Sequence, residues 1–177
     1  RFVVQRPRAL HRVGFAAGSG ITPILSIMAS TLEEQTESKF TLVYGNQRMA
    51  SVMFNEALQD LKDRFADRLT LIHILSRQAQ EVPLLEGRID GDKVRAIIAA
   101  LLPVKSMDEV FICGPEGMIE ATEAALLQAG VPANRVHTKR FTSSTPAAPR
   151  QAIAAASKTS KEAIQLRIVL DGKPYDM

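Results

Sequence analysis

Short apolar runs alternate with longer segments of helical periodicity between residues 12 and 141. The pattern predicts strands at 13–17, 40–44, 69–75, 109–113 and 135–141, and helices at 23–36, 51–65, 91–102 and 116–129. Strands that alternate with helices are typical of a parallel sheet with helices on both faces. We therefore predict an α/β fold, a doubly wound five-stranded parallel sheet in the order 3-2-1-4-5.

The composition changes after Phe141. Residues 142–163 are rich in Ser, Thr, Ala and Pro, as linkers are. Residues 164–170 then alternate as a strand does, and Asp171-Gly172 is a strong hairpin signal. The pattern predicts a linker followed by a truncated β-hairpin, whose second strand would begin just as the sequence stops at Met177.

The composition excludes several classes of protein. The 177 residues, 46% of them hydrophobic, suit one cored domain with extra pieces at its ends, and they contain no apolar run of membrane-spanning length. The net charge is +3, but no basic run carries interleaved aromatic residues, which argues against nucleic-acid binding. The single cysteine excludes an internal disulfide and a cysteine-ligated cluster within these residues, and a reduced, cytoplasmic setting is the default expectation. The oligomeric state is not indicated.

Residues 18–23, Gly-Ser-Gly-Ile-Thr-Pro, directly follow the first predicted strand. The glycines permit a tight turn, and Thr22 and Pro23 are expected as the N-cap and first residue of the next helix. A helix N-terminus at the carboxyl end of a strand is a ready site for a phosphate or pyrophosphate. The alternative is a strand–helix turn that binds nothing.

Three further motifs follow the next strands, at residues 44–47, 76–77 and 113–115. The carboxyl ends of parallel strands meet at one edge of the sheet, where dinucleotides bind. The second strand ends without the carboxylate that usually binds the ribose, and the third fingerprint glycine is absent. This pattern differs from the ordinary NAD-binding fold of alcohol-type dehydrogenases.

Individual residues suggest more specific chemistry. Ser76 and Arg77 combine a hydroxyl with a guanidinium and suit a phosphate monoester, although an exposed polar pair closing a strand remains the alternative. Cys113 is either a buried, inert thiol or part of a site where Gly114 lets a flat ligand pass closely. His73 lies inside the third strand and is expected to be a packed core residue.

In combination, the motifs at 18–23, 44–46, 76–77, 113–115 and 137–141 resemble the nucleotide-binding domain of the ferredoxin–NADP reductase-like family. The segments 73–78, 84–94 and 111–118 are most similar to the reductase components of phenylacetyl-CoA oxygenases. That resemblance implies four parts: the end of a flavin-binding barrel at 1–11, an NADP-binding domain at 12–141, a linker at 142–163, and the start of a 2Fe–2S ferredoxin-like domain at 164–177.

The resemblance also implies residue roles, with no metal ligand among them. Cys113 is the candidate catalytic residue, which helps to place the hydride-donating carbon of NADPH. Lys139 occupies a position where the family usually has Glu, near the junction of flavin and nicotinamide. The implied cofactor-binding residues comprise the pyrophosphate turn (Gly18, Ser19, Gly20, Ile21, Thr22, Pro23), the 2′-phosphate pair (Ser76, Arg77), the nicotinamide slot (Gly114, Pro115), and Asn46, Met118 and Phe141.

The resemblance implies the NADPH-binding portion of a flavin-dependent electron-transfer reductase. Electrons would pass from NADPH through FAD to a 2Fe–2S centre and on to an oxygenase component. These residues hold neither the flavin barrel nor the cluster cysteines, so they are expected to be inactive alone. The alternatives are an NADH-using oxygenase reductase and a non-catalytic nucleotide-binding module.

Overall fold

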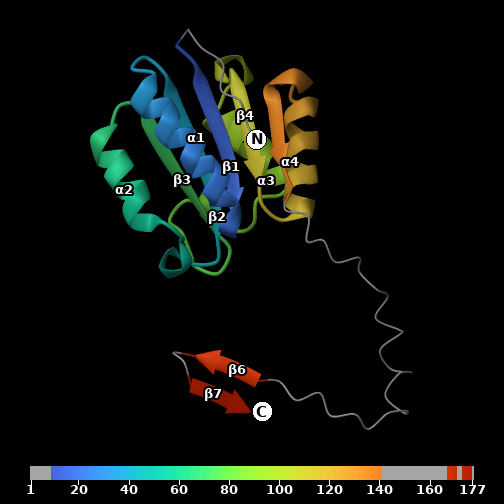
Figure 1. Cartoon of the computed structure of the whole chain (residues 1–177). Coiled ribbons are helices and arrows are strands. Elements are labelled where there is room, and N and C mark those ends of the chain that lie inside the picture. Colours follow the sequence, from blue (N-terminus) through green and yellow to red (C-terminus); the bar gives the residue numbers. More distant parts are fainter. Residues whose placement is uncertain (1–8, 141–166, 171–172, 177) are drawn as a thin grey trace, which may run out of the picture. The chain divides into compact units, whose positions relative to one another are not determined.

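The computed structural model describes residues 9–140 and the backbone of residues 167–170 and 173–176. Within residues 9–140, five parallel strands form one sheet in the order β3-β2-β1-β4-β5 (Figure 1). This confirms the predicted sheet and its strand order. The strands are β1 (His11–Ala17), β2 (Lys39–Asn46), β3 (Leu69–Leu75), β4 (Glu109–Cys113) and β5 (Val136–Lys139).

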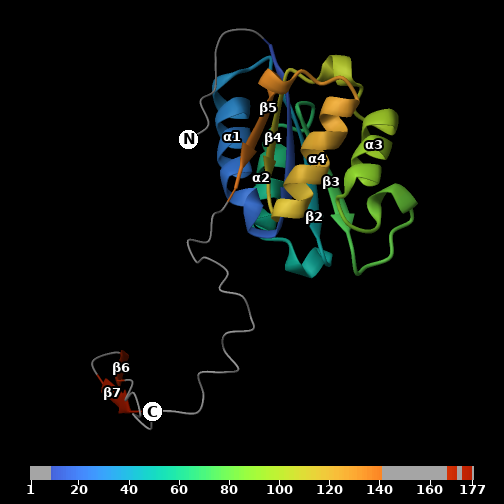
Figure 2. The ribbon, with the colours of Figure 1, turned by 90° about the vertical axis from the view of Figure 1, so that its right-hand side faces the viewer.

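Helices cover both faces of the sheet, as Figure 2 shows from the side. The first two helices contribute to one apolar core, and the last two contribute to the core on the other face. The α-helices are α1 (Ile21–Glu34), α2 (Asn55–Arg64), α3 (Gly91–Ala100) and α4 (Glu116–Gln128). Short 3₁₀ helices lie at η1 (Gly18–Gly20), η2 (Met49–Ser51), η3 (Pro83–Leu85), η4 (Val104–Ser106) and η5 (Ala133–Arg135).

The central strand β1 is held firmly between these layers. Its residues 12–16 are all buried, as in parallel strands covered on both faces. At its start, the fully buried Arg12 donates to Glu109 over 2.6 Å and to Gln35 over 2.7 Å, which ties β1 to β4 and to the end of α1. These contacts fix the amino end of the central strand. The loops that follow the strands lie at the opposite, carboxyl end of the sheet.

The second helix begins later than the sequence predicts. It starts at Asn55, because η2 and the residues after it occupy the region expected to be its first turn. Leu58 and Leu61 are buried, but Phe54, which precedes them at helical spacing, does not lie on the buried face. Phe54 caps the helix in the left-handed conformation, with φ of 58°, and its side chain is 46% exposed.

Residues 142–177 form a separate unit, of which the structure describes a two-stranded antiparallel hairpin. Its strands are β6 (Arg167–Leu170) and β7 (Lys173–Asp176), with Leu170 paired to Lys173. The predicted hairpin is therefore confirmed, but the expectation that the chain stops before the second strand is wrong. Phe141 and the predicted linker at 142–163 lie outside the described residues.

Candidate nucleotide-binding site

The turn after β1 is built from η1 and the start of α1. Gly18 has φ of 52°, a left-handed conformation that glycine adopts readily. The helix begins at Ile21 with Gly20 as its N-cap, so Thr22 is not the N-cap that the sequence suggests. Instead, the Thr22 hydroxyl donates to the Ser19 carbonyl over 3.1 Å. Pro23 lies in the first turn, where its missing N–H breaks no helical hydrogen bond.

Two glycines bring the turns after β1 and β4 into direct contact. A Cβ on Gly20 would lie 2.1 Å from the Cys113 carbonyl oxygen and 2.8 Å from the Gly114 nitrogen. A Cβ on Gly114 would lie 3.3 Å from the Ala17 nitrogen, at the end of β1, and 2.7 Å from the Met118 methyl carbon. The first and fourth sequence motifs therefore meet backbone to backbone, at a contact that only glycine permits.

The end of β2 supports the same turn. The Tyr44 hydroxyl donates to the Gly18 carbonyl over 3.0 Å, and its ring is fully buried. Burial raises the pKa of the Tyr44 phenol, against the opposing influence of the Asn46 side chain and the Met53 backbone. The amide nitrogen of Asn46 is buried near this hydroxyl and makes no well-formed hydrogen bond, so it can donate to a polar ligand atom at this edge.

The loops after β2 and β3 are tied together beyond the ends of their strands. Ser76 N–H donates to the Asn46 carbonyl over 3.0 Å, and Arg77 N–H donates to the Gln47 carbonyl over 2.8 Å. This backbone pairing holds Arg77 beside the loop that carries Arg48, and both arginine side chains are exposed. Neither guanidinium forms an ion pair with a carboxylate in the part of the chain described. Two cations therefore face solvent at this edge.

Arg48 was missed by the reasoning from sequence. It lies two residues past Asn46, in a loop with no recognisable motif of its own. The signal that could have identified it is the strand order, because β2 and β3 are neighbours and their carboxyl ends must bring Arg48 and Arg77 to the same edge.

Cys113, at the carboxyl end of β4, lies in the core. Its side chain is fully buried in the cluster that also contains Ile21 and Phe111. Burial raises the pKa of the thiol, although the nearby Lys139 ammonium opposes that shift. The residue is therefore a neutral thiol at neutral pH, which does not suit a nucleophile.

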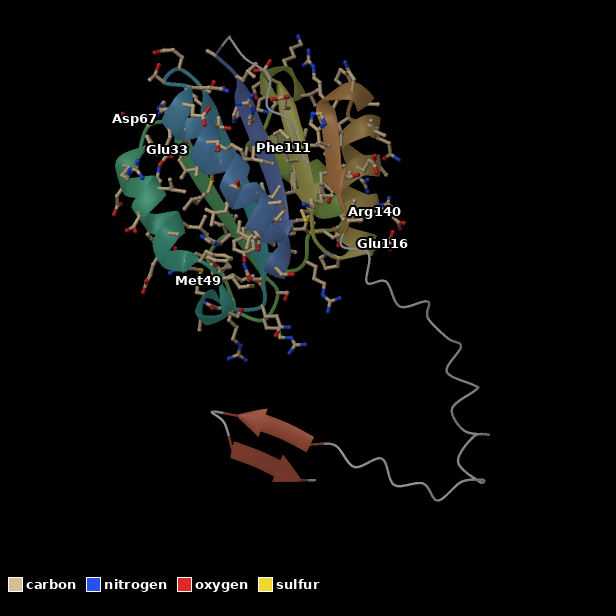
Figure 3. All side chains as sticks on the ribbon, viewed as in Figure 1. Glu33, Met49, Asp67, Phe111, Glu116 and Arg140 are labelled. Carbon is tan, nitrogen blue, oxygen red and sulfur yellow. The ribbon has the colours of Figure 1, made fainter. Side chains whose placement is uncertain are left out.

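Charged side chains surround the carboxyl ends of β4 and β5. Lys139 is paired in register with Cys113 and its side chain is exposed. Arg140 donates to the Glu116 carboxylate over 2.8 Å at the start of α4. Figure 3 shows Glu116, Arg140 and Met49 at the same end of the sheet, and Asp67 at the opposite end.

The four predicted motifs therefore line one edge, in the order of the strands β3, β2, β1 and β4. Of the predicted site residues, Ser19, Thr22 and Pro115 are exposed. Ile21 and Met118 are buried and pack in the core beneath the turns. His73 is only half-buried on the edge strand β3, and both of its ring nitrogens are buried without partners. Its ring nitrogens are packed away from solvent, in line with the core position that the sequence predicts, although the residue as a whole is not fully buried.

A cavity of about 360 Å³ lies at the opposite, amino edge of the sheet. Its lining includes His11, Lys39, Asp67 and Leu101. Because none of the four motifs reaches it, it is separate from the candidate site. Among the described residues, no group of three or more His, Cys, Asp or Glu is arranged to hold a metal ion. No helix in this part of the chain is both long and apolar enough to span a bilayer.

Comparison with known families agrees with this geometry. The sequence profile of the family described as "Oxidoreductase NAD-binding domain" matches residues 15–124. The chain belongs to this family, which is the nucleotide-binding domain of ferredoxin–NADP reductase-like oxidoreductases.

Two curated relatives are similar over most of the chain. A component of the 1,2-phenylacetyl-CoA epoxidase of Escherichia coli K12 is 46% identical over 137 residues, covering 77% of this chain and 38% of that protein. The ferredoxin reductase component of 3-ketosteroid-9-alpha-monooxygenase from Rhodococcus rhodochrous is 34% identical over 165 residues, covering 92% of this chain and 44% of that protein. The chain thus spans less than half the length of these relatives.

Solved structures show the same fold at lower identity. The FAD/NAD-binding domain of a nitric oxide dioxygenase from Vibrio cholerae has a TM-score of 0.64 and 23% identity, covering 79% of this chain and 54% of that one. The cytochrome b5 reductase domain of Ulva prolifera nitrate reductase has a TM-score of 0.63 and 22% identity, covering 75% of this chain and 49% of that one.

Proposed function

We propose that this domain binds NADPH in a flavin-dependent reductase, which passes electrons through FAD to a 2Fe–2S centre and then to an oxygenase that acts on phenylacetyl-CoA. The observation that carries the proposal is the row of four loops along one sheet edge, with Gly20 against the Cys113 carbonyl at one end and the exposed Arg77 at the other. The 46% identity to a component of a phenylacetyl-CoA epoxidase supports the choice of partner.

Each loop has a distinct part in this proposal. The positive dipole end of α1 attracts the pyrophosphate, and Ser76 and Arg77 bind the 2′-phosphate with Arg48 nearby. Gly114 and Pro115 leave room for the flat nicotinamide ring. Bound FAD supplies the chemistry that converts a two-electron hydride transfer into single-electron steps. This chain's residues orient the donor and exclude water from it.

The proposal also assigns the parts of the chain. Residues 1–11 would be the end of a flavin-binding barrel, 12–141 the NADP-binding domain, 142–163 a linker, and 164–177 the start of a 2Fe–2S ferredoxin-like domain. The hairpin of β6 and β7 suits the start of a separate β-rich unit.

The direct test is calorimetric titration of the 177-residue chain with NADPH and with NADH. We expect both to bind and NADPH to bind more tightly, because only NADPH carries the 2′-phosphate. If neither NADPH nor NADH binds, the proposal is overturned.

An NADH-using reductase is the second candidate, and one finding favours it. The NADH-cytochrome b5 reductase 2 of Aspergillus oryzae is 27% identical over 112 residues of the chain. Tighter binding of NADH than of NADPH in the same titration would select this alternative. A non-catalytic module would bind nucleotide but fail to pass hydride to flavin in the flavin-loaded reductase.

Replacing Cys113 with alanine tests the catalytic assignment. The buried thiol belongs to the residue whose backbone carbonyl packs against Gly20. We therefore propose that the thiol acts by holding the Cys113–Gly114 peptide in position. In the flavin-loaded reductase, Cys113→Ala should slow flavin reduction about tenfold and change NADPH affinity by less than about twofold, a pattern expected of an interaction that matters mainly in the transition state. Stopped-flow measurement of flavin reduction checks this.

Cys113→Ser serves as the matched variant for this test. It nearly keeps the size of the side chain and changes its polarity, so its rate should fall between those of the unchanged protein and Cys113→Ala. If Cys113→Ala reduces flavin at the unchanged rate, the thiol is only a packing residue of β4.

A further inference from the structure

The carbonyl groups of Gly18 and Ser19, in the turn after β1, are engaged by donors from the protein itself. The Gly18 carbonyl accepts from the Ile21 N–H and, over 3.0 Å, from the Tyr44 hydroxyl. The Ser19 carbonyl accepts from the Ile21 N–H and, over 3.1 Å, from the Thr22 hydroxyl. Carbonyl oxygens carry partial negative charge, and one turned toward a bound phosphate would repel it. Engaging them with donors reduces that repulsion at the positive, N-terminal end of α1.

Among these donors, Tyr44 is the one that comes from another strand. It lies on β2, beside β1 in the sheet, and its ring is fully buried, so its hydroxyl has a fixed position. The acceptor Gly18 has φ of 52°, a conformation that a flexible glycine adopts but does not hold by itself. The bond from Tyr44 restrains this turn. Burial also raises the pKa of the phenol above its ordinary value, so the hydroxyl keeps its proton at neutral pH.

We propose that Tyr44 is a positioning residue for the pyrophosphate of the bound dinucleotide, acting through the Gly18 carbonyl. This rests on the proposed function, because it assigns a role within the same nucleotide site. The proposal makes a distinct prediction. Tyr44 should affect the binding of NADPH and NADH alike, because both carry the pyrophosphate, whereas Arg77 should affect only the binding of the 2′-phosphate, which NADPH alone carries.

The test is Tyr44→Phe, which removes one hydroxyl and keeps the ring. The 177-residue chain is titrated with NADPH, with NADH, and with 2′-AMP, which has a 2′-phosphate but no pyrophosphate. Loss of this partly buried hydrogen bond should weaken the binding of NADPH and of NADH equally, by about fivefold to tenfold, and should leave the affinity for 2′-AMP within about twofold. Thr22→Val, which removes the exposed donor to Ser19, should weaken both dinucleotides in the same direction but by less.

Thr31→Val is the matched control. It also removes a buried hydroxyl, one that donates to the Ile27 carbonyl over 2.7 Å within α1, away from the four loops. It should lower the melting temperature and leave all three affinities unchanged. The role of Tyr44 is overturned if Tyr44→Phe binds the dinucleotides as the unchanged chain does, or if it weakens 2′-AMP as much as NADPH. If the unchanged chain binds none of the three, the proposed function itself fails.

Discussion

Replacing Gly20 with alanine should lower the affinity for NADPH at least about a hundredfold, which corresponds to about 2.7 kcal/mol. The new Cβ would lie 2.1 Å from the Cys113 carbonyl oxygen and 2.5 Å from its carbon. Both are backbone atoms of a central strand, so no side-chain rotation relieves the clash. The turn after β1 must move away from β4, which separates the pyrophosphate loop from the nicotinamide slot. Calorimetric titration with NADPH measures the loss.

The same substitution should also destabilise the fold, by about 1–3 kcal/mol, as overpacked sites generally do. Gly117→Ala is the control, because Gly117 lies in the first turns of α4 and a Cβ there meets nothing within 4 Å. That exchange should stabilise the domain by about 0.5–1 kcal/mol and leave binding unchanged. A Gly20→Ala chain that binds NADPH normally would show that the two turns need not touch for the site to work.

The sheet could be predicted from sequence because each strand carries a short, nearly continuous apolar run between helical stripes. That periodicity also placed the four motifs at one edge, since parallel strands end together. The close packing of the turns after β1 and β4 could not be predicted in the same way. The contact of Gly20 with the Cys113 peptide depends on how closely two distant turns pack, and no local pattern encodes that distance.

Two local predictions from the sequence, at Thr22 and Phe54, are wrong for the same physical reason. Thr22 looks like an N-cap by residue type, yet the 3₁₀ turn at residues 18–20 leads into a helix that starts two residues earlier than predicted, at Ile21. Phe54 fits an apolar stripe by spacing, yet the chain must turn sharply between β2 and α2 and uses this residue for the turn. In both cases loop geometry overrode a correct local preference.

The hydrogen bond from Tyr44 to Gly18 shows what the fold adds to the motifs. Residues 26 positions apart meet because β1 and β2 are neighbours, and the bond links two motifs that look independent in sequence. The unpaired Asn46 amide nitrogen also became visible only when the surrounding acceptors could be placed. Sequence therefore indicates the chemistry at this edge, while the three-dimensional contacts show which residues bind and which only position others.

Arg77→Ala should weaken NADPH by about 1.5–3 kcal/mol, the usual contribution of a hydrogen bond to a charged group. The Arg77 backbone is fixed by its bond to the Gln47 carbonyl, so the substitution removes the guanidinium without moving the loop. NADH lacks the 2′-phosphate, and its affinity should barely change. Titration of the 177-residue chain with both nucleotides and with 2′-AMP measures the difference, and 2′-AMP should lose affinity as NADPH does.

Arg64→Ala separates this specific effect from the loss of one positive charge. Arg64 is also exposed, but it ends α2 and pairs over 3.1 Å with Glu33, which lies away from the carboxyl edge of the sheet in Figure 3. Its removal should leave all three affinities unchanged. Arg77→Ala and Tyr44→Phe should therefore give opposite selectivity patterns: the first discriminates between NADPH and NADH, and the second does not. Equal losses of NADPH and NADH in Arg77→Ala would mean that the guanidinium supports the loop and reads no phosphate.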